Sequence, residues 1–196
     1  MAEVLKLARG EFILGGQRSG KSRRAETLAQ QWLAQSSQHR AVLIATAQPW
    51  DEEMRKRITR HQQDRAERVP GMRTVEEPLQ LAQAITQHST AQTLLVVDCL
   101  TLWLTNLLMP AESLKRNQAP AFSAYAQSAM LLVAIRAAPG PLLLVGNEIG
   151  LGVIPMGRET RDFVDALGRL NQEVAEACER VTFMAAGLPL TLKGQP

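Results

Sequence analysis

The amino-acid sequence predicts an α/β fold in which a mainly parallel β-sheet is flanked by helices. Short apolar runs alternate with segments of helical periodicity, which is the pattern of strands connected by covering helices. Several runs are apolar at every position, as expected for strands buried on both faces. The chain has 196 residues, 45% of them apolar and 21% charged, which suffices for one domain with its own core. We therefore expect residues 1–196 to form a single domain, with residues 1–10 as an N-terminal extension.

The first half of the chain begins with the apolar run 12–14, which predicts a strand that ends in glycines. Helical spacing of apolar residues then starts at Lys21. Asp51 is expected to cap a charged helix, because its side chain can accept a backbone hydrogen bond and two acidic residues follow it. The expected elements after the first helix are a strand at 41–45, the charged helix at 51–64, a weak strand at 73–75, a helix after Pro78 and the most apolar strand at 93–98.

The second half contains two segments that read as loops. Residues 110–120 are polar and aperiodic, which predicts a loop or lid, and the glycine-rich stretch 147–157 predicts a shaped loop. The expected regular elements are a helix at 123–138, a strand at 142–145, an amphipathic helix at 160–179, a strand at 181–185 and a short strand at 190–192.

Composition narrows the class of protein. The net charge is only +3, from 22 basic and 19 acidic residues, and aromatic residues make up 4%, which disfavours a nucleic-acid binder but suits an anionic ligand. Cys99 and Cys178 lie in apolar contexts and are expected to be buried thiols. No stretch predicts a membrane span or a signal peptide, so we expect a cytoplasmic protein.

A phosphate-binding pattern follows the first expected strand. Gly15, Gly20, Lys21 and Ser22 fit G-x-x-x-x-G-K-[ST] between a strand and a helix, a context that makes a chance match rarer. Backbone N–H groups of such a loop surround phosphates; Lys21 would reach the β and γ phosphates, and the Ser22 hydroxyl would bind Mg²⁺. The fold is therefore expected to be P-loop NTPase-like. The expected cradle consists of Gly15, Gly16, Gln17, Arg18, Ser19, Gly20, Lys21 and Ser22.

Asp98 ends the most apolar strand and is the candidate for the carboxylate that Mg²⁺ requires in such sites. The alternative is that Asp98 caps a following helix. We favour the metal role because of the P-loop. The loop by itself does not identify a reaction, since ATPases, switches and small-molecule kinases share it.

Further blocks recur in a characteristic order from Phe12 to Lys193. They are GGQRSGKSR at 15–23 with Ala25 and Glu26, ATAQ at 45–48, DEEM at 51–54 with Arg57, Ile58 and His61, DCLT at 98–101, TNLL at 105–108, NEIGLGVIP at 147–155, and then Arg158, Arg161, Asp162, Phe163, Gly168, Arg169, Asn171 and Gln172. The set resembles the bifunctional adenosylcobinamide kinase / adenosylcobinamide-phosphate guanylyltransferase family of cobalamin assembly.

The resemblance implies two reactions and a catalytic histidine. The kinase reaction would move the γ-phosphate of ATP or GTP to the aminopropanol hydroxyl of adenosylcobinamide. The transferase reaction would leave GMP from GTP on the histidine, here His61, and pass it to adenosylcobinamide phosphate to give adenosylcobinamide-GDP. The resemblance also implies a homotrimer with sites near subunit contacts.

Family nucleotide contacts extend the site beyond the P-loop. The resemblance assigns such contacts to Ala45, Thr46, Ala47, Gln62, Gln63, Asp64, Arg65, Glu76 and Asp98, with Arg68 as an alternative to Arg65. Without the resemblance, His61 would be taken as a packed or surface residue, and the basic residues of 55–68 as a solvated helix face. Beside a P-loop, the same charges would neutralise a triphosphate or its pyrophosphate leaving group.

Two other functions stay open at this point. The chain could be a P-loop small-molecule kinase without guanylyl transfer, or a non-catalytic nucleotide-dependent binding module. The sequence does not choose between ATP and GTP as phosphate donor, and it does not indicate which residues hold the corrinoid.

Overall fold

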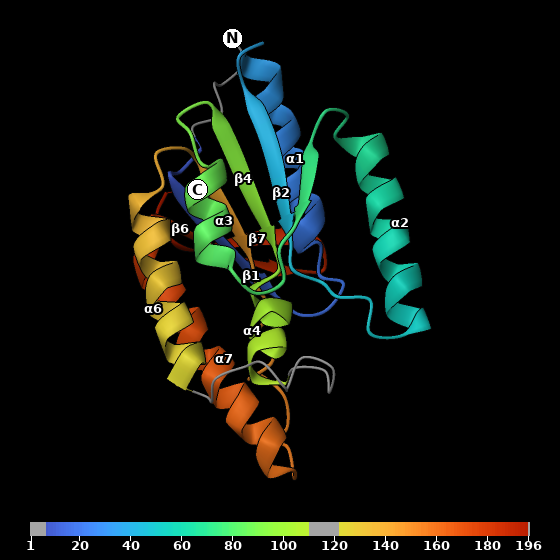
Figure 1. Cartoon of the computed structure of the whole chain (residues 1–196), viewed down its shortest axis with the longest axis vertical. Coiled ribbons are helices and arrows are strands. Elements are labelled where there is room, and N and C mark those ends of the chain that lie inside the picture. Colours follow the sequence, from blue (N-terminus) through green and yellow to red (C-terminus); the bar gives the residue numbers. More distant parts are fainter. Residues whose placement is uncertain (1–6, 110–121, 196) are drawn as a thin grey trace.

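The computed structural model describes residues 7–109 and 122–195. Its described part contains a seven-stranded sheet in the order β3-β2-β4-β5-β1-β6-β7, with helices on both sides (Figure 1). All neighbouring strands pair in parallel except β6 and β7. The elements are β1 Gly10–Gly15, α1 Lys21–Gln35, β2 Arg40–Ala45, α2 Glu52–Arg68, β3 Arg73–Glu76, α3 Leu81–His88, β4 Thr93–Asp98, α4 Leu100–Leu108, α6 Phe122–Ala137, β5 Leu142–Val145, α7 Arg158–Ala177, β6 Arg180–Ala185 and β7 Leu188–Lys193.

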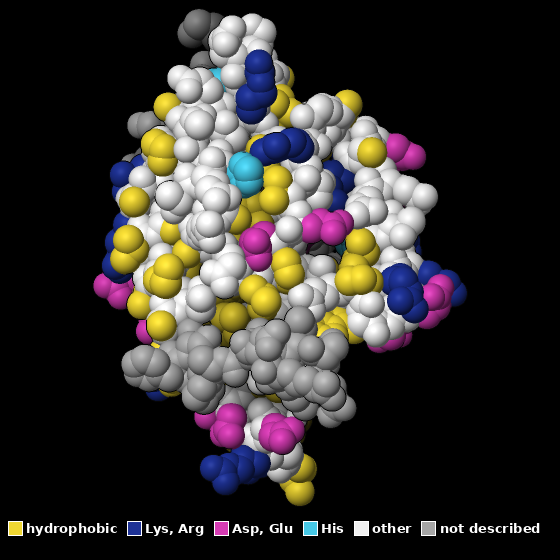
Figure 2. Space-filling view, viewed as in Figure 1, with side chains coloured by type: hydrophobic (Ala, Val, Ile, Leu, Met, Phe, Trp, Pro, Cys, Tyr) yellow, Lys and Arg dark blue, Asp and Glu magenta, His cyan; other side chains and the backbone are white. Residues whose placement is uncertain are grey.

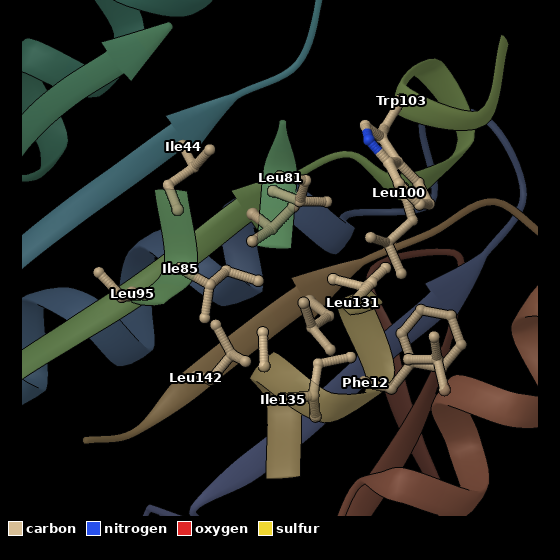
Figure 3. Close-up of a cluster of buried hydrophobic side chains, with 14 of the residues drawn as sticks. Phe12, Ile44, Leu81, Ile85, Leu95, Leu100, Trp103, Leu131, Ile135 and Leu142 are labelled. Atoms are coloured by element: carbon tan, nitrogen blue, oxygen red, sulfur yellow. The ribbon is translucent and has the colours of Figure 1, made fainter. Parts of the chain in front are cut away.

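Two apolar clusters cover the two faces of the sheet. Alternate strand residues divide between them: Phe12 belongs to the cluster with α3, α4, α6 and α7, whereas Ile13 belongs to the cluster with α1. Figure 3 shows the first cluster, where Leu81 and Ile85 of α3 face strand residues of the sheet. Each large apolar side chain buried in this way contributes about 1.5–3 kcal/mol. The clusters explain why the central strands are apolar at every position.

The expected fold class is confirmed. Helix α4, Leu100–Leu108, was not among the expected elements, and the other differences lie at element boundaries. The charged helix does not stop at residue 64 but continues to Arg68. Its last turn is stabilised by an ion pair between Arg68 and Asp64 at 3.4 Å and by Val69, which packs in the α1-side cluster. Asp51 caps the helix as expected, since its Oδ1 accepts a hydrogen bond from Met54 N at 2.7 Å.

Other boundaries shift by a few residues. β1 begins at Gly10, so the expected extension ends one residue earlier, and the last strand spans Leu188–Lys193 rather than 190–192. Both cysteines are buried and free, as expected. The loop expected at 110–120 lies outside the described residues. Among the described helices, none combines the length and apolar character that a membrane crossing needs.

Candidate nucleotide site

The P-loop joins the end of β1 to the start of α1. Gly15 and Gly20 have φ values of 150° and 101°, which residues with a side chain rarely adopt. A Cβ on Gly15 would overlap the Met184 carbonyl oxygen and lie 2.7 Å from Ser19 Oγ. Gly20 is the N-cap of α1. The two glycines therefore let the backbone bend tightly between strand and helix, with the α1 N-terminus open to an anion.

Lys21 lies under this loop. Its Nζ donates to the carbonyl oxygens of Gly15 at 3.0 Å and Gly16 at 2.6 Å. The side chain is buried, and burial lowers the pKa of Lys21, while nearby Cys99 and Asp98 raise it and Arg57 lowers it. The amine is thus positioned at the base of the loop and close enough to Asp98 to feel its charge.

Ser22 and Asp98 are the two expected Mg²⁺ ligands. In the described part of the chain, neither the Ser22 hydroxyl nor the Asp98 carboxylate makes a side-chain hydrogen bond, and no cluster of three or more His, Cys, Asp or Glu side chains could hold a metal. One hydroxyl and one carboxylate fit Mg²⁺, which takes few protein ligands and fills its shell with phosphate oxygens and water. The capping alternative for Asp98 is not supported, because Cys99 is the N-cap of α4 and no side chain caps that helix.

Hydrogen bonds of Thr46 connect the end of β2 to the end of β4. Its hydroxyl donates to Cys99 O at 2.7 Å and accepts from Cys99 N at 2.9 Å, and its backbone N donates to Asp98 O at 3.2 Å. Asn106 of α4 donates to Thr46 O at 2.8 Å. Thr46 is fully buried, and these hydrogen bonds hold the backbone of Asp98 and Cys99 at the end of β4. Ala45 and Ala47 on either side of it are half-buried.

Helix α2 lies beyond α1 at the β3 edge of the sheet (Figure 1), and its last turn contacts α1. Arg68 binds Glu26 of α1 at 2.9 Å. Arg65 is buried; burial lowers its pKa, whereas Asp98 and Glu26 raise it. The charge of Arg57, on the same helix, lowers the pKa of Lys21. The first turn of α2 instead carries exposed charged pairs (Figure 2), such as Arg55 with Glu52.

His61 lies one helical turn from Arg57 and one from Arg65, so the three share a face. It is exposed and therefore not a packed core residue. Between Arg65 and Arg68, the geometry favours Arg65 as the nucleotide contact, because Arg68 is already paired with Glu26. Arg57 and Arg65 thus lie near enough to Lys21 and Asp98 for their charges to act on one another, and His61 is on the same face of α2.

The other expected nucleotide contacts lie on the exposed surface of α2 or at the sheet edge. Gln62 and Gln63 are exposed on α2, and Asp64 pairs with Arg68. Glu76 is exposed at the end of β3, the edge strand. β3 is four strand positions from β1 in the sheet order, which corresponds to about 19 Å at usual strand spacing. Glu76 could therefore meet only the part of a nucleotide that lies far from the P-loop.

Sequence reasoning assigned no role to several polar residues that hold this site. Asn106 and Asn171 are buried on helices, and Asn171 donates to Asn147 O at 3.1 Å. Thr101 accepts a hydrogen bond from Asn147 N at 2.8 Å. The sequence feature that could have indicated these residues is an amide or hydroxyl side chain at a helix position that faces the core. A polar side chain at such a position usually makes a specific hydrogen bond. A separate cavity of about 530 Å³ lies between α4, α6 and α7.

The fold and this site define a P-loop nucleotide-binding protein. A solved structure from Pyrococcus horikoshii OT3 shares the fold, with a TM-score of 0.55 and 9% identity over 98% of this chain and 90% of that one. The chain belongs to the cobinamide kinase / cobinamide phosphate guanyltransferase family, whose model matches residues 11–192.

Curated relatives agree with this family. The bifunctional adenosylcobalamin biosynthesis protein CobP of Pseudomonas aeruginosa is 48% identical, with 95% of this chain and 98% of the relative covered. The bifunctional adenosylcobalamin biosynthesis protein CobU of Escherichia coli is 36% identical, and that of Salmonella typhimurium is 31% identical, each with 93% of this chain and 98% of the relative covered.

Proposed function

We propose that this chain phosphorylates adenosylcobinamide and then transfers GMP from GTP to adenosylcobinamide phosphate, giving adenosylcobinamide-GDP. The observation that carries the proposal is one ordered P-loop, with Lys21 beneath it and Asp98 beside it, in a chain of this family. Both reactions begin with a purine nucleoside triphosphate, so one triphosphate site can serve both.

In the kinase reaction the protein positions the triphosphate and neutralises its charge. The nucleotide would lie along residues 15–22 with its phosphates at the start of α1, and Lys21 would bind the β and γ phosphates. Ser22 and Asp98 would hold Mg²⁺, which when bound supplies charge neutralisation between the phosphates. The acceptor hydroxyl attacks the γ-phosphorus, the bond to the β–γ bridging oxygen breaks, and the nucleoside diphosphate leaves.

In the transferase reaction His61 is the nucleophile. An imidazole nitrogen attacks the α-phosphorus of GTP, and pyrophosphate leaves with the electron pair of the broken P–O bond. An oxygen of adenosylcobinamide phosphate then attacks the same phosphorus and releases His61. Two easier displacements replace one difficult one. Support comes from Arg57 and Arg65, which flank His61 on one helix face and would neutralise the leaving pyrophosphate.

We also propose that the chain works in the cytoplasm as a homotrimer with sites near subunit contacts. Exposed apolar side chains support a subunit interface: Leu188, Leu190 and Leu192 of β7 are 71%, 59% and 58% exposed, and Val153 and Met156 in the loop after β5 are 96% exposed. Patches of this kind on a soluble protein usually mark an interaction surface.

Product analysis tests the function. Purified chain is incubated with adenosylcobinamide and either GTP or ATP plus GTP, and the corrinoids are identified by mass. Adenosylcobinamide phosphate followed by adenosylcobinamide-GDP is the expected result. Phosphorylation without GMP addition would favour a simple P-loop kinase, and nucleotide binding without any product would favour a binding module. Comparison of ATP with GTP in the first reaction also identifies the phosphate donor.

A further inference from the structure

Glu148 lies directly beside the phosphate loop. It follows β5, which is placed between β1 and β4 in the sheet, the strands that end in Gly15 and Asp98. The backbone N of Glu148 donates to Gly15 O at 3.2 Å, and Lys21 Nζ donates to the same oxygen at 3.0 Å. Glu148 and the lysine that would bind the β and γ phosphates therefore meet at one atom of the loop.

The Glu148 side chain is held in place rather than free to rotate. Its Oε1 accepts a hydrogen bond from Gly150 N at 2.9 Å, and its Oε2 lies 3.5 Å from Asn171 Nδ2. Asn171 is only 4% exposed, and the same amide donates to Asn147 O at 3.1 Å. The carboxylate is half-buried, and Oε2, with a single long contact, keeps the capacity to accept a proton or a strong hydrogen bond.

The other charged groups near this end of the central strands are not available to accept a proton from the acceptor hydroxyl. Lys21 is a cation and cannot take a proton, and Asp98 is the proposed Mg²⁺ ligand. Glu77, near the sheet edge, uses its Oε1 to accept from Leu79 N at 2.9 Å and Gln80 N at 2.7 Å. Of the described carboxylates at the ends of β1, β4 and β5, Glu148 is thus the one available to an acceptor at the γ-phosphate.

We infer that Glu148 is the general base of the kinase reaction, a role that rests on the proposed function. Glu148 Oε2 takes the proton from the acceptor hydroxyl as its oxygen forms the bond to the γ-phosphorus. The electron pair of the broken P–O bond leaves on the nucleoside diphosphate, and the proton on Glu148 passes to solvent. Asn171 is a positioning residue that orients the carboxylate.

A general base is needed in only one of the two reactions proposed for this site. The acceptor of the kinase reaction is a hydroxyl, whose proton must be removed. The acceptor of the guanylyl transfer is a phosphate oxygen that is already ionised at neutral pH. Glu148 is therefore required for the first reaction and dispensable for the second, although both use the P-loop.

The test measures both reactions separately for the wild type, Glu148→Gln and a matched control, Glu179→Gln, whose surface carboxylate pairs with Arg9 at the other end of the sheet. The kinase reaction is assayed with adenosylcobinamide and ATP, and guanylyl transfer with separately supplied adenosylcobinamide phosphate and GTP. We expect Glu148→Gln to lower the kinase kcat by about 10²–10⁴-fold. Guanylyl transfer, nucleotide Kd and Tm should stay near wild-type values, and the control should be unaffected in every assay.

A second variant distinguishes a base from a structural residue. Glu148→Ala should also lose kinase activity, and added formate, a small carboxylate that fits the space left, should raise its rate severalfold. Kinase activity of Glu148→Gln within threefold of wild type, an equal loss of both reactions, or no effect of formate on Glu148→Ala would overturn the inference. A wild-type chain that formed neither product would instead refute the proposed function and the base with it.

Discussion

Lys21 is the residue on which both proposed reactions depend. Its Nζ lies at the base of the only phosphate loop among the described residues, where it donates to Gly15 and Gly16. We expect Lys21→Ala to lower kcat/KM of the kinase and of guanylyl transfer by more than about 10³-fold, because the triphosphate loses its main cationic contact. Steady-state assays of each reaction check this. A variant that keeps full guanylyl transfer at saturating GTP would refute the single site.

Asp98 should govern the metal dependence. We expect Asp98→Asn to raise the Mg²⁺ concentration needed for half-maximal activity by about tenfold or more, because an amide is a poorer ligand for a hard cation. The folded state should change little, since the Asp98 carboxylate caps no helix. Mg²⁺ titrations and thermal melts provide the comparison. Unchanged metal dependence together with a lower Tm would assign Asp98 a structural role.

The two buried thiols should make the free energy of unfolding decrease at high pH. Burial raises the pKa of Cys99 and of Cys178 from an ordinary value of 9.0 to about 12 in each case. Above pH 9 the unfolded chain loses these protons while the folded chain keeps them, so the free energy of unfolding decreases as pH rises. Each thiol should account for about 1.4 kcal/mol between pH 8 and 10. Urea unfolding at pH 8 and pH 10 measures this decrease in the free energy of unfolding. The decrease should be smaller by that amount in Cys99→Ala than in the wild type, and an equal decrease in the two proteins would contradict the assignment.

At the residue scale, the sequence predicts local motifs well and contacts between elements poorly. Residues 15–22 could be assigned because the pattern itself fixes the backbone that binds phosphate. The contact of Glu148 N with Gly15 O joins positions 133 residues apart in the chain, and no local pattern encodes it. The roles of Asn171 and Asn106 likewise became visible only when their carbonyl partners were known.

Helix α2 carries Arg65 and His61, two residues on which the proposed transferase reaction depends. The Arg68–Glu26 pair at 2.9 Å attaches its C-terminal turn to α1, and the Glu26 side chain is only 7% exposed. The Arg55–Glu52 pair on the same helix is exposed at both partners, so it contributes little. The Arg68–Glu26 pair is therefore the ion pair that attaches the C-terminal half of α2, with Arg65 and His61, to α1, beside the packing of Val69.

We expect Arg68→Ala to slow guanylyl transfer about tenfold while the kinase rate changes less than threefold, because the helix that carries His61 and Arg65 loses its ion pair with α1. Arg55→Ala is the matched control and should leave both rates unchanged. Rates of both reactions and Tm are measured for the two variants. Equal slowing of the two reactions, or an equal effect of Arg55→Ala, would remove the attachment of α2 from the mechanism.

The elements themselves were predictable where periodicity was strong. Asp51 was recognisable as a cap because the cap is a contact between residues three positions apart. The end of α2 was not, since the turn from 65 to 68 is stabilised by Glu26 and by the packing of Val69 against the sheet layer. These are tertiary contacts, which commonly override local preference at helix ends.

The whole molecule brings the site together through its strand order. β4, β5 and β1 are adjacent, so Asp98, Glu148 and Gly15 meet at one end of the sheet although β5 follows β4 by more than forty residues. The apolar runs predicted a buried parallel sheet, but they carry no information on which runs are neighbours. A single sheet end that holds all three residues is the basis for the claim that one triphosphate site serves two reactions.

Covalent labelling with GTP tests that claim most directly. The wild type, His61→Ala and Lys21→Ala are each incubated with GTP labelled at the α-phosphate, and modified peptides are identified by mass. We expect one acid-labile GMP adduct on His61 of the wild type and none in either variant, with the kinase reaction of His61→Ala retained at least in part. Label retained by His61→Ala, or an adduct mapped to another residue, would contradict the account.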